Sequence, residues 1–365
     1  MKFVCDGLTL AEAVGKVTKA CAVRTTAPIY ECIKITAKGE EVAFLATDGE
    51  LSIRKAVKAE IFEEGEACVP GKLFSDFLSK LSSEEVSVST SDRSVAIKYG
   101  DSVSYLQYLN AEEFPKINFE IGENHFVLKQ KELKRAISNT VFCCAQDDSR
   151  PILKGCLMEF GDELEMTALD GYRLALSKAP VLAKQSEESV ICPARALNEI
   201  VRMLSDDESE ITLYTEGGTL MVNLDGLTVV TRLYVGEFIK KDNVIPRLFS
   251  SYVTVSREEL TRSVERAAVF IRGDKNNLVT LDVKGGIMKI SSVSEVGNVS
   301  ESIAIELDGK DLTISMNAKY LLDGLKALDE EKIVISFNGA LSPFILQNNE
   351  KKEGLYLILP VRNAS

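Results

Sequence analysis

The sequence predicts an α+β protein of three repeated domains, each a double βαβββ motif with antiparallel sheets outside and two helices inside. Three observations predict it: amphipathic helix patterns recur at a nearly constant spacing, a second strand-helix pattern recurs before each of them, and strand-like runs with short turns connect the two. A chain of 365 residues is also longer than one ordinary core, which favours two or three domains.

The later helix of each repeat carries the clearest signal. Helix patterns at 70–81, 193–204 and 317–328 follow one another at intervals of about 124 residues. Apolar residues recur in each copy at i, i+4 and i+7, the spacing of one helix face, and a strand-like run follows each helix. The aligned apolar positions are Phe74, Leu197 and Leu321, then Leu78, Val201 and Leu325, then Leu81, Leu204 and Leu328.

An earlier helix in each repeat follows a short strand. The strands lie at 2–5, 126–128 and 252–255. The pairs Thr9 with Glu12 and Ser256 with Glu259 match a capping box, in which a hydroxyl and a carboxylate each accept a free backbone N–H. Lys129 stands at the cap position of the middle copy, which predicts a weaker helix end there. The apolar stripe aligns as Ala13, Leu133 and Leu260, then Val17, Ile137 and Val264.

An Asp-Gly pair between strand-like runs is a third repeated feature. It occurs within 46–49 and 168–171, whereas the third repeat has no equivalent at 292–297. Extended stretches separate the repeats and place the predicted domains at 1–121, 122–248 and 249–365.

Composition excludes several classes of protein. No stretch reaches the ~18 apolar residues of a membrane helix, and the eight cysteines form no CxxC pair, so reduced, buried thiols are expected in place of disulfides or a metal site. His125 is the only histidine, which disfavours a catalytic triad or a zinc site. Carboxylates are plentiful, so a hydrolase with two catalytic carboxylates stays open, as does an unrelated repeat scaffold.

Four features carry a resemblance to a known family: the repeat order, the length, the run Ala-Leu-Asp-Gly-Tyr-Arg-Leu-Ala at 168–175, and the ending Tyr-Leu-Ile-Leu-Pro-Val-Arg at 356–362. In these features the chain resembles the bacterial DNA polymerase III beta subunit (DNA sliding clamp) family. The resemblance covers essentially the whole chain. It implies a non-catalytic processivity factor whose clamp-type domains join head to tail as a ring homodimer around double-stranded DNA. The lack of a long apolar run predicts a cytoplasmic protein without a membrane partner, and no cofactor or metal is expected. The implied protein partners are the DNA polymerase III alpha subunit, the clamp loader and other proteins with a clamp-binding motif.

Basic residues on the polar helix faces are the candidate DNA contacts. The net charge of −12 disfavours tight phosphate binding, but it is compatible with a basic hole and an acidic rim that hold DNA loosely and without base readout. Arg24, in a loop after the first helix, matches a DNA contact of the family. The candidate set is Arg24, Lys72, Lys134, Arg135, Arg195, Arg202, Arg262 and Lys319. For any one of them, a merely solvated helix face is the alternative.

The resemblance also implies a peptide-binding groove between the second and third domains. Apolar side chains would form its sub-pockets, and Arg173 or Arg362 would bind peptide carbonyl or carboxylate groups. Its predicted walls are Ile152, Leu153, Leu169, Gly171, Tyr172, Arg173, Leu174, Val244, Leu341, Leu357, Leu359, Pro360, Val361 and Arg362. Three positions depart from the family pattern: Ile239 replaces a proline, Asn276 an aromatic residue, and Tyr172 a frequent histidine. Plain strand core is the alternative for Leu357 and Leu359.

The subunit interface would pair the first domain with the third. Leu106 and Tyr108 on one side, and Phe270 and Ile271 on the other, are the candidates, with ordinary core as the alternative.

Overall fold

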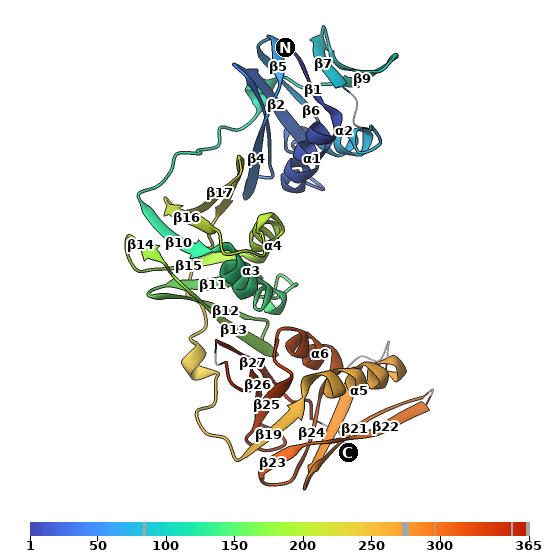
Figure 1. Cartoon of the computed structure of the whole chain (residues 1–365), viewed down its shortest axis with the longest axis vertical. Helices are drawn as coiled ribbons and strands as arrows, with labels where there is room; N and C mark the ends of the chain where they lie inside the picture. The colour runs from blue at the N-terminus through green and yellow to red at the C-terminus, as the bar shows by residue number, and fades with distance from the viewer. Residues whose placement is uncertain (83–84, 272–276, 296, 352, 363–365) are drawn as a thin grey trace. The chain divides into compact units, whose positions relative to one another are not determined.

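The computed structural model describes residues 1–82, 85–271, 277–295, 297–351 and 353–362, which form two compact units (Figure 1). The first unit comprises Met1–Val127 and Glu210–Leu233, and the second comprises Leu128–Ser209 and Tyr234–Ser365. The second repeat of the chain therefore contributes elements to both units.

Each repeat contains the same pattern twice, as predicted: a strand, a helix and three further strands. The first has β1 (Lys2–Asp6), α1 (Gly7–Val17), β2 (Cys32–Lys38), β3 (Glu41–Thr47), β4 (Leu51–Lys58), β5 (Glu60–Glu63), β6 (Gly65–Pro70), α2 (Gly71–Leu78), β7 (Glu85–Ser91), β8 (Ser94–Tyr99) and β9 (Ser102–Gln107). The second has β10 (Asn124–Lys129), α3 (Gln130–Ser138), β11 (Gly155–Phe160), β12 (Glu163–Leu169), β13 (Arg173–Pro180), β14 (Ala183–Lys184), β15 (Glu188–Pro193), α4 (Ala194–Met203), β16 (Glu210–Glu216), β17 (Thr219–Leu224) and β18 (Leu227–Arg232). The third has β19 (Ser251–Ser256), α5 (Arg257–Phe270), β20 (Leu278–Lys284), β21 (Ile287–Ser294), β22 (Gly297–Ala304), β23 (Glu306–Gly309), β24 (Leu312–Asn317), α6 (Ala318–Lys326), β25 (Lys332–Phe337), β26 (Phe344–Asn348) and β27 (Gly354–Ile358). Short β5, β14 and β23 are additions in corresponding places.

Neighbouring strands pair antiparallel within each unit. The first unit has a sheet in the order β5-β1-β7-β8-β9 and a second that contains β16-β17-β18-β4-β3-β2-β6. The second unit has sheets in the orders β15-β11-β12-β13-β27-β26-β25-β19-β23 and β22-β21-β20-β24. Strands of successive repeats therefore join edge to edge, β4 with β18 and β13 with β27.

The predicted apolar stripes form the helix side of each core. Phe74, Leu197 and Leu321 are fully buried, and α1 packs beside α2, α3 beside α4, and α5 beside α6 (Figure 1). Leu81 and Val201 are the exceptions in these stripes, because each is only half-buried. Apolar burial at helical spacing thus accounts for the paired helices of each repeat.

The helix caps follow the prediction in two copies of three. The Ser256 hydroxyl accepts a hydrogen bond from the Glu259 N–H, and Lys129 makes no capping bond. The prediction for the first copy was wrong, because the N-cap is Asp6, whose Oδ1 lies 2.8 Å from Thr9 N. Glu12 instead pairs with Lys16 one turn later. A carboxylate at the end of the preceding strand is the stronger acceptor for the free N–H groups of the first turn.

None of the helices that the structure describes is both long and apolar enough to span a lipid bilayer.

Candidate functional site

The Asp-Gly pair of the second repeat forms a tight turn between β12 and β13. Gly171 has a φ of 94°, a left-handed conformation that favours glycine. Asp170 Oδ1 accepts hydrogen bonds from Tyr172 N at 2.9 Å and Arg173 N at 3.1 Å. The turn leaves Tyr172 exposed and directs Arg173 into the protein.

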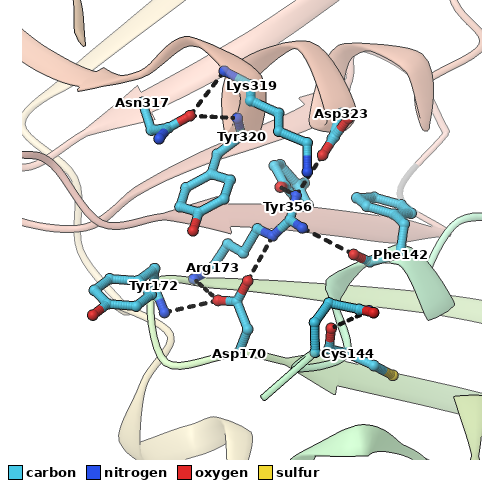
Figure 2. A network of polar contacts seen from close by, with 11 residues as sticks. Phe142, Cys144, Asp170, Tyr172, Arg173, Asn317, Lys319, Tyr320, Asp323 and Tyr356 are labelled. Atoms are coloured by element: carbon cyan, nitrogen blue, oxygen red, sulfur yellow. Dashed lines mark hydrogen bonds and ion pairs between the residues drawn. The ribbon is translucent and has the colours of Figure 1, made fainter. Parts of the chain in front are cut away.

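Arg173 holds the second and third repeats together through a buried polar network (Figure 2). Its Nε lies 2.9 Å from Asp170 Oδ2, and its Nη1 lies 2.7 Å from Asp323 Oδ2 on α6. The guanidinium also donates to the Tyr356 hydroxyl at 3.2 Å and to the Phe142 carbonyl at 2.9 Å. Burial raises the pKa of Tyr356 above its usual value, so this hydroxyl stays protonated.

An aromatic pair lies at the edge of this network. The Tyr172 ring stacks on Tyr320 with 6.4 Å between centroids, and the Arg173 guanidinium lies 4.4 Å from the Tyr320 centroid. Tyr172 is 63% exposed, whereas only 7% of Arg173 is exposed. Arg173 therefore differs from the expectation of a peptide-binding cation, because its donors already bind two carboxylates, a hydroxyl and a carbonyl.

Half of the predicted groove residues, seven of fourteen, meet in one apolar cluster, which we call the linker cluster. Its buried members are Ala145, Leu153, Leu169, Leu174, Leu176, Ile345 and Leu357, and its partly buried members are Ile152, Phe238, Ile239, Val244, Ile245, Phe249, Leu355 and Leu359. The cluster members that the sequence did not predict include Phe238, Ile245 and Phe249 from the segment between β18 and β19. The recurring apolar residues at 238–249 were the available signal.

The remaining groove candidates have different environments. Leu341 is 66% exposed, Pro360 and Val361 are half-buried, and Arg362 is exposed. Val361 N donates to Ser315 O at 2.8 Å, which fixes the chain after β27. Leu357 is buried in the cluster, as the strand-core alternative expected, and Leu359 is only partly buried. Asn276 lies outside the described residues.

Most of the candidate DNA contacts are exposed side chains. Arg24, Lys72, Arg195 and Lys319 are exposed, and Lys134 is half-buried. Arg202 and Arg262 are exposed but pair with Glu199 and Glu258 of their own helices.

Arg135 departs from the expectation of a DNA contact. Its guanidinium lies 2.8 Å from Glu132, 2.8 Å from the Lys178 carbonyl and 2.9 Å from Glu353 in the third repeat. These partners give Arg135 a structural role between β13 and the segment before β27.

The interface candidates also differ from one another. Leu106 on the edge strand β9 and the nearby Tyr108 are half-buried. Phe270 is half-buried at the end of α5, whereas Ile271 is 1% exposed and belongs to the core. Ile271 is therefore an ordinary core residue, as the alternative interpretation expected.

Three family models match consecutive parts of the chain. They describe the N-terminal, central and C-terminal domains of the DNA polymerase III beta subunit and match residues 1–118, 127–240 and 242–362. The chain belongs to this family. Its predicted family, its three-domain clamp fold and its sliding-clamp function are thereby confirmed, and the hydrolase and unrelated-scaffold alternatives fall away. Members are DNA replication proteins that act as non-catalytic processivity factors.

Individual relatives are similar over nearly their whole length. The beta sliding clamp of Halalkalibacterium halodurans is 32% identical over 378 residues, with 99% of this chain and all of the relative covered. The Staphylococcus aureus beta sliding clamp is 31% identical, with 94% of each chain covered. The crystal structure of the Bacillus subtilis DNA polymerase sliding clamp superimposes with a TM-score of 0.95 at 30% identity, with 100% of this chain and 99% of that one covered. A Pseudomonas aeruginosa sliding clamp bound to griselimycin has a TM-score of 0.92 at 25% identity, with 99% of each chain covered.

Proposed function

We propose that two copies of this chain join head to tail as a ring homodimer that encircles duplex DNA and tethers the replicative polymerase. The match of all three beta-subunit domains along one chain carries this proposal. The proposal includes three clamp domains, at 1–121, 122–248 and 249–365. It also includes location in the cytoplasm and action without a cofactor.

Equivalent basic side chains support the DNA-facing role of the helices. Lys72, Arg195 and Lys319 occupy the same position near the start of α2, α4 and α6, and all three are exposed. Exposed cations that reach phosphates without reading bases would hold DNA loosely, which suits a ring that slides.

The linker cluster, together with the exposed Tyr172 and Leu341, forms the proposed groove for partner peptides. Buried leucines give it an apolar floor, while Tyr172 and Leu341 stay exposed for contact. An apolar floor with exposed anchors suits an extended peptide with hydrophobic side chains. The partners would be the DNA polymerase III alpha subunit, the clamp loader and other proteins with a clamp-binding motif.

Topology-dependent retention on DNA tests the ring. A dimer should have about twice the 40.1 kDa mass of one chain. After loading, it should remain on circular DNA and be lost when that DNA is cut once. A monomer that leaves both forms at the same rate would refute the proposal.

Leu341→Ala tests the groove separately. Because the Leu341 side chain is exposed, the variant should keep its thermal stability and lose affinity for a polymerase alpha-subunit peptide by roughly tenfold. Leu182→Ala, at a leucine that is 46% exposed outside the groove, is the matched control and should bind normally. Equal affinity of the two variants would remove Leu341 from the site.

A further inference from the structure

The junction of β4 with β18 in the first unit repeats the junction of β13 with β27 in the second. Gly49 has a φ of 95°, and Asp48 Oδ1 accepts from Glu50 N at 3.0 Å and Leu51 N at 2.8 Å, as in the Asp170 turn. The strands then pair in the same register. In the first unit Ser52 lies opposite Val230, and at the corresponding place in the second unit Leu174 lies opposite Leu357.

One further backbone bond fixes the equivalence. Arg232 N donates to Glu50 O at 2.9 Å, and Leu359 N donates to Tyr172 O at 2.9 Å. Glu50 therefore stands in the position of Tyr172, and Arg232 in the position of Leu359. The first unit contains the framework of the proposed groove with different side chains.

A cavity of about 410 Å³ lies at this junction, a size within the range of ligand sites. Its buried lining includes Ser52, Met221 and Val230 from three adjacent strands. The Gly49 turn, the β16–β17 turn and the segment at 116–120 form its other sides. That segment connects the first and second repeats, as the segment at 238–249 connects the second and third.

The connecting segment is a fixed wall. The Arg54 guanidinium lies 5.8 Å from the Phe119 ring centroid, and Glu120 N donates to Asn118 Oδ1 at 2.9 Å. A Cβ at Gly122 would lie 2.8 Å from Glu216 Cβ and 3.2 Å from the Thr215 carbonyl oxygen, so glycine permits the close approach of this segment to β16. The cavity thus has an ordered wall on the side of the connecting segment.

The rim of this cavity is charged where the proposed groove is apolar. Glu50, Glu120 and Glu216 contribute three exposed carboxylates, and Lys116 and Arg232 contribute two cations. Across the part of the chain that the structure describes, no ion pair involves these five side chains. Carboxylates that outnumber the cations favour a ligand with positive charge beside an aliphatic group.

We propose that this cavity is a second docking site, which takes an extended peptide segment of a partner protein with a small aliphatic side chain between basic ones. The aliphatic side chain packs on Met221 and Val230, and the basic side chains face the three glutamates. The peptide groove proposed above is the template for this inference, but the cavity and its charges stand apart from that groove.

Methionine methyl NMR of the full chain tests the site, because Met221 is the one of seven methionines that lines the cavity. The probes are the capped peptide Gly-Lys-Val-Lys-Gly and its counterpart Gly-Glu-Val-Glu-Gly. At ~1 mM peptide, a site with a Kd near 1 mM is half occupied. The Met221 signal should shift saturably with the lysine peptide alone, while the signal of Met158, buried in the second unit, stays in place.

Two variants decide between this site and non-specific attraction. The double variant Glu50→Gln, Glu120→Gln should weaken the lysine peptide by roughly three- to tenfold. Tyr172→Ala, at the equivalent position of the proposed groove, should leave the Met221 titration unchanged and weaken the polymerase peptide instead. A stationary Met221 signal, equal shifts with both peptides, or an unaffected double variant would overturn the inference. Polymerase-peptide binding, measured separately, would still report on the proposed groove.

Discussion

Arg173 on β13 and Asp323 on α6 form an ion pair across the second and third repeats, with 2.7 Å between Nη1 and Oδ2. Asp170 binds the same guanidinium from the other side, so one cation satisfies two carboxylates. The arginine side chain is 6% exposed, which makes it the centre of the network and not a free surface charge.

Replacing Arg173 should destabilise the second unit. Arg173→Met leaves Asp170 and Asp323 without their shared cation in a largely buried place, and we expect a loss of about 3 kcal/mol in urea unfolding. Arg202→Met is the control, because that arginine is 63% exposed and pairs with Glu199 of its own helix. Its effect should stay within about 0.5 kcal/mol. Similar losses in both variants would contradict a special role for Arg173.

Gly324 permits close packing of α6 on β27. A Cβ at this position would lie 2.1 Å from Cδ1 of the buried Tyr356 ring. We therefore expect Gly324→Ala to cost about 2 kcal/mol by overpacking, measured as a lower urea midpoint. In Gly15→Ala, nothing lies within 4 Å of the new Cβ, and helix propensity predicts a neutral or stabilising effect of up to about 1 kcal/mol. A loss for Gly15→Ala equal to that for Gly324→Ala would refute the packing argument.

Asp6 should support α1 only while it is ionised. Hydrogen bonds from the Thr9 backbone and hydroxyl lower the pKa of Asp6. Its contribution is therefore present above the unfolded pKa of about 3.9 and is lost as the pH falls through the lower folded value. Asp6→Ala should lower the Tm at pH 7, and this difference should shrink in strong acid. Glu12→Ala, which removes the exposed pair with Lys16, should change the Tm less.

Helical periodicity was enough to find the repeat, because the stripe of Phe74, Leu197 and Leu321 is buried in every copy. The order of strands and helices along each repeat followed from the same repetition, whereas the first helix cap did not. Asp6 and Thr9 both have capping oxygens, and only the chain path out of β1 decides between them.

The candidate site was harder to predict, because charge and exposure depend on partners distant in sequence. Arg173 is bound by Asp323, which is 150 residues away in the sequence, and Arg135 is similarly held by Glu353. No local pattern encodes such pairs. The cavity beside Met221 was also hidden, because its walls come from three segments far apart in the chain.

Arg24 and Arg135 should separate DNA contact from structure. If exposed Arg24 neutralises one phosphate, Arg24→Ala should reduce the slope of log affinity against log salt for a duplex oligonucleotide by about 1. Arg135→Ala should leave that slope unchanged and lower the Tm, because it breaks the ion pairs with Glu132 and Glu353. If Arg135→Ala reduced the salt slope and Arg24→Ala lowered the Tm instead, Arg135 would be the DNA contact and Arg24 the structural residue.

The buried thiols should resist modification and make the fold sensitive to alkali. All eight cysteines are free and buried, and burial raises the pKa of Cys68 and of Cys156 to about 12. At pH 8 the native chain should react slowly with a disulfide reagent such as DTNB, and all eight thiols should react in concentrated guanidinium chloride.

Above the unfolded pKa of about 8.5, the unfolded thiols ionise while the native ones keep their protons. The native state then binds more protons, so its stability should fall as the pH rises from about 8.5 toward 12. Rapid labelling of Cys156 or Cys192 in native protein at pH 8 would show that their surroundings open to solvent.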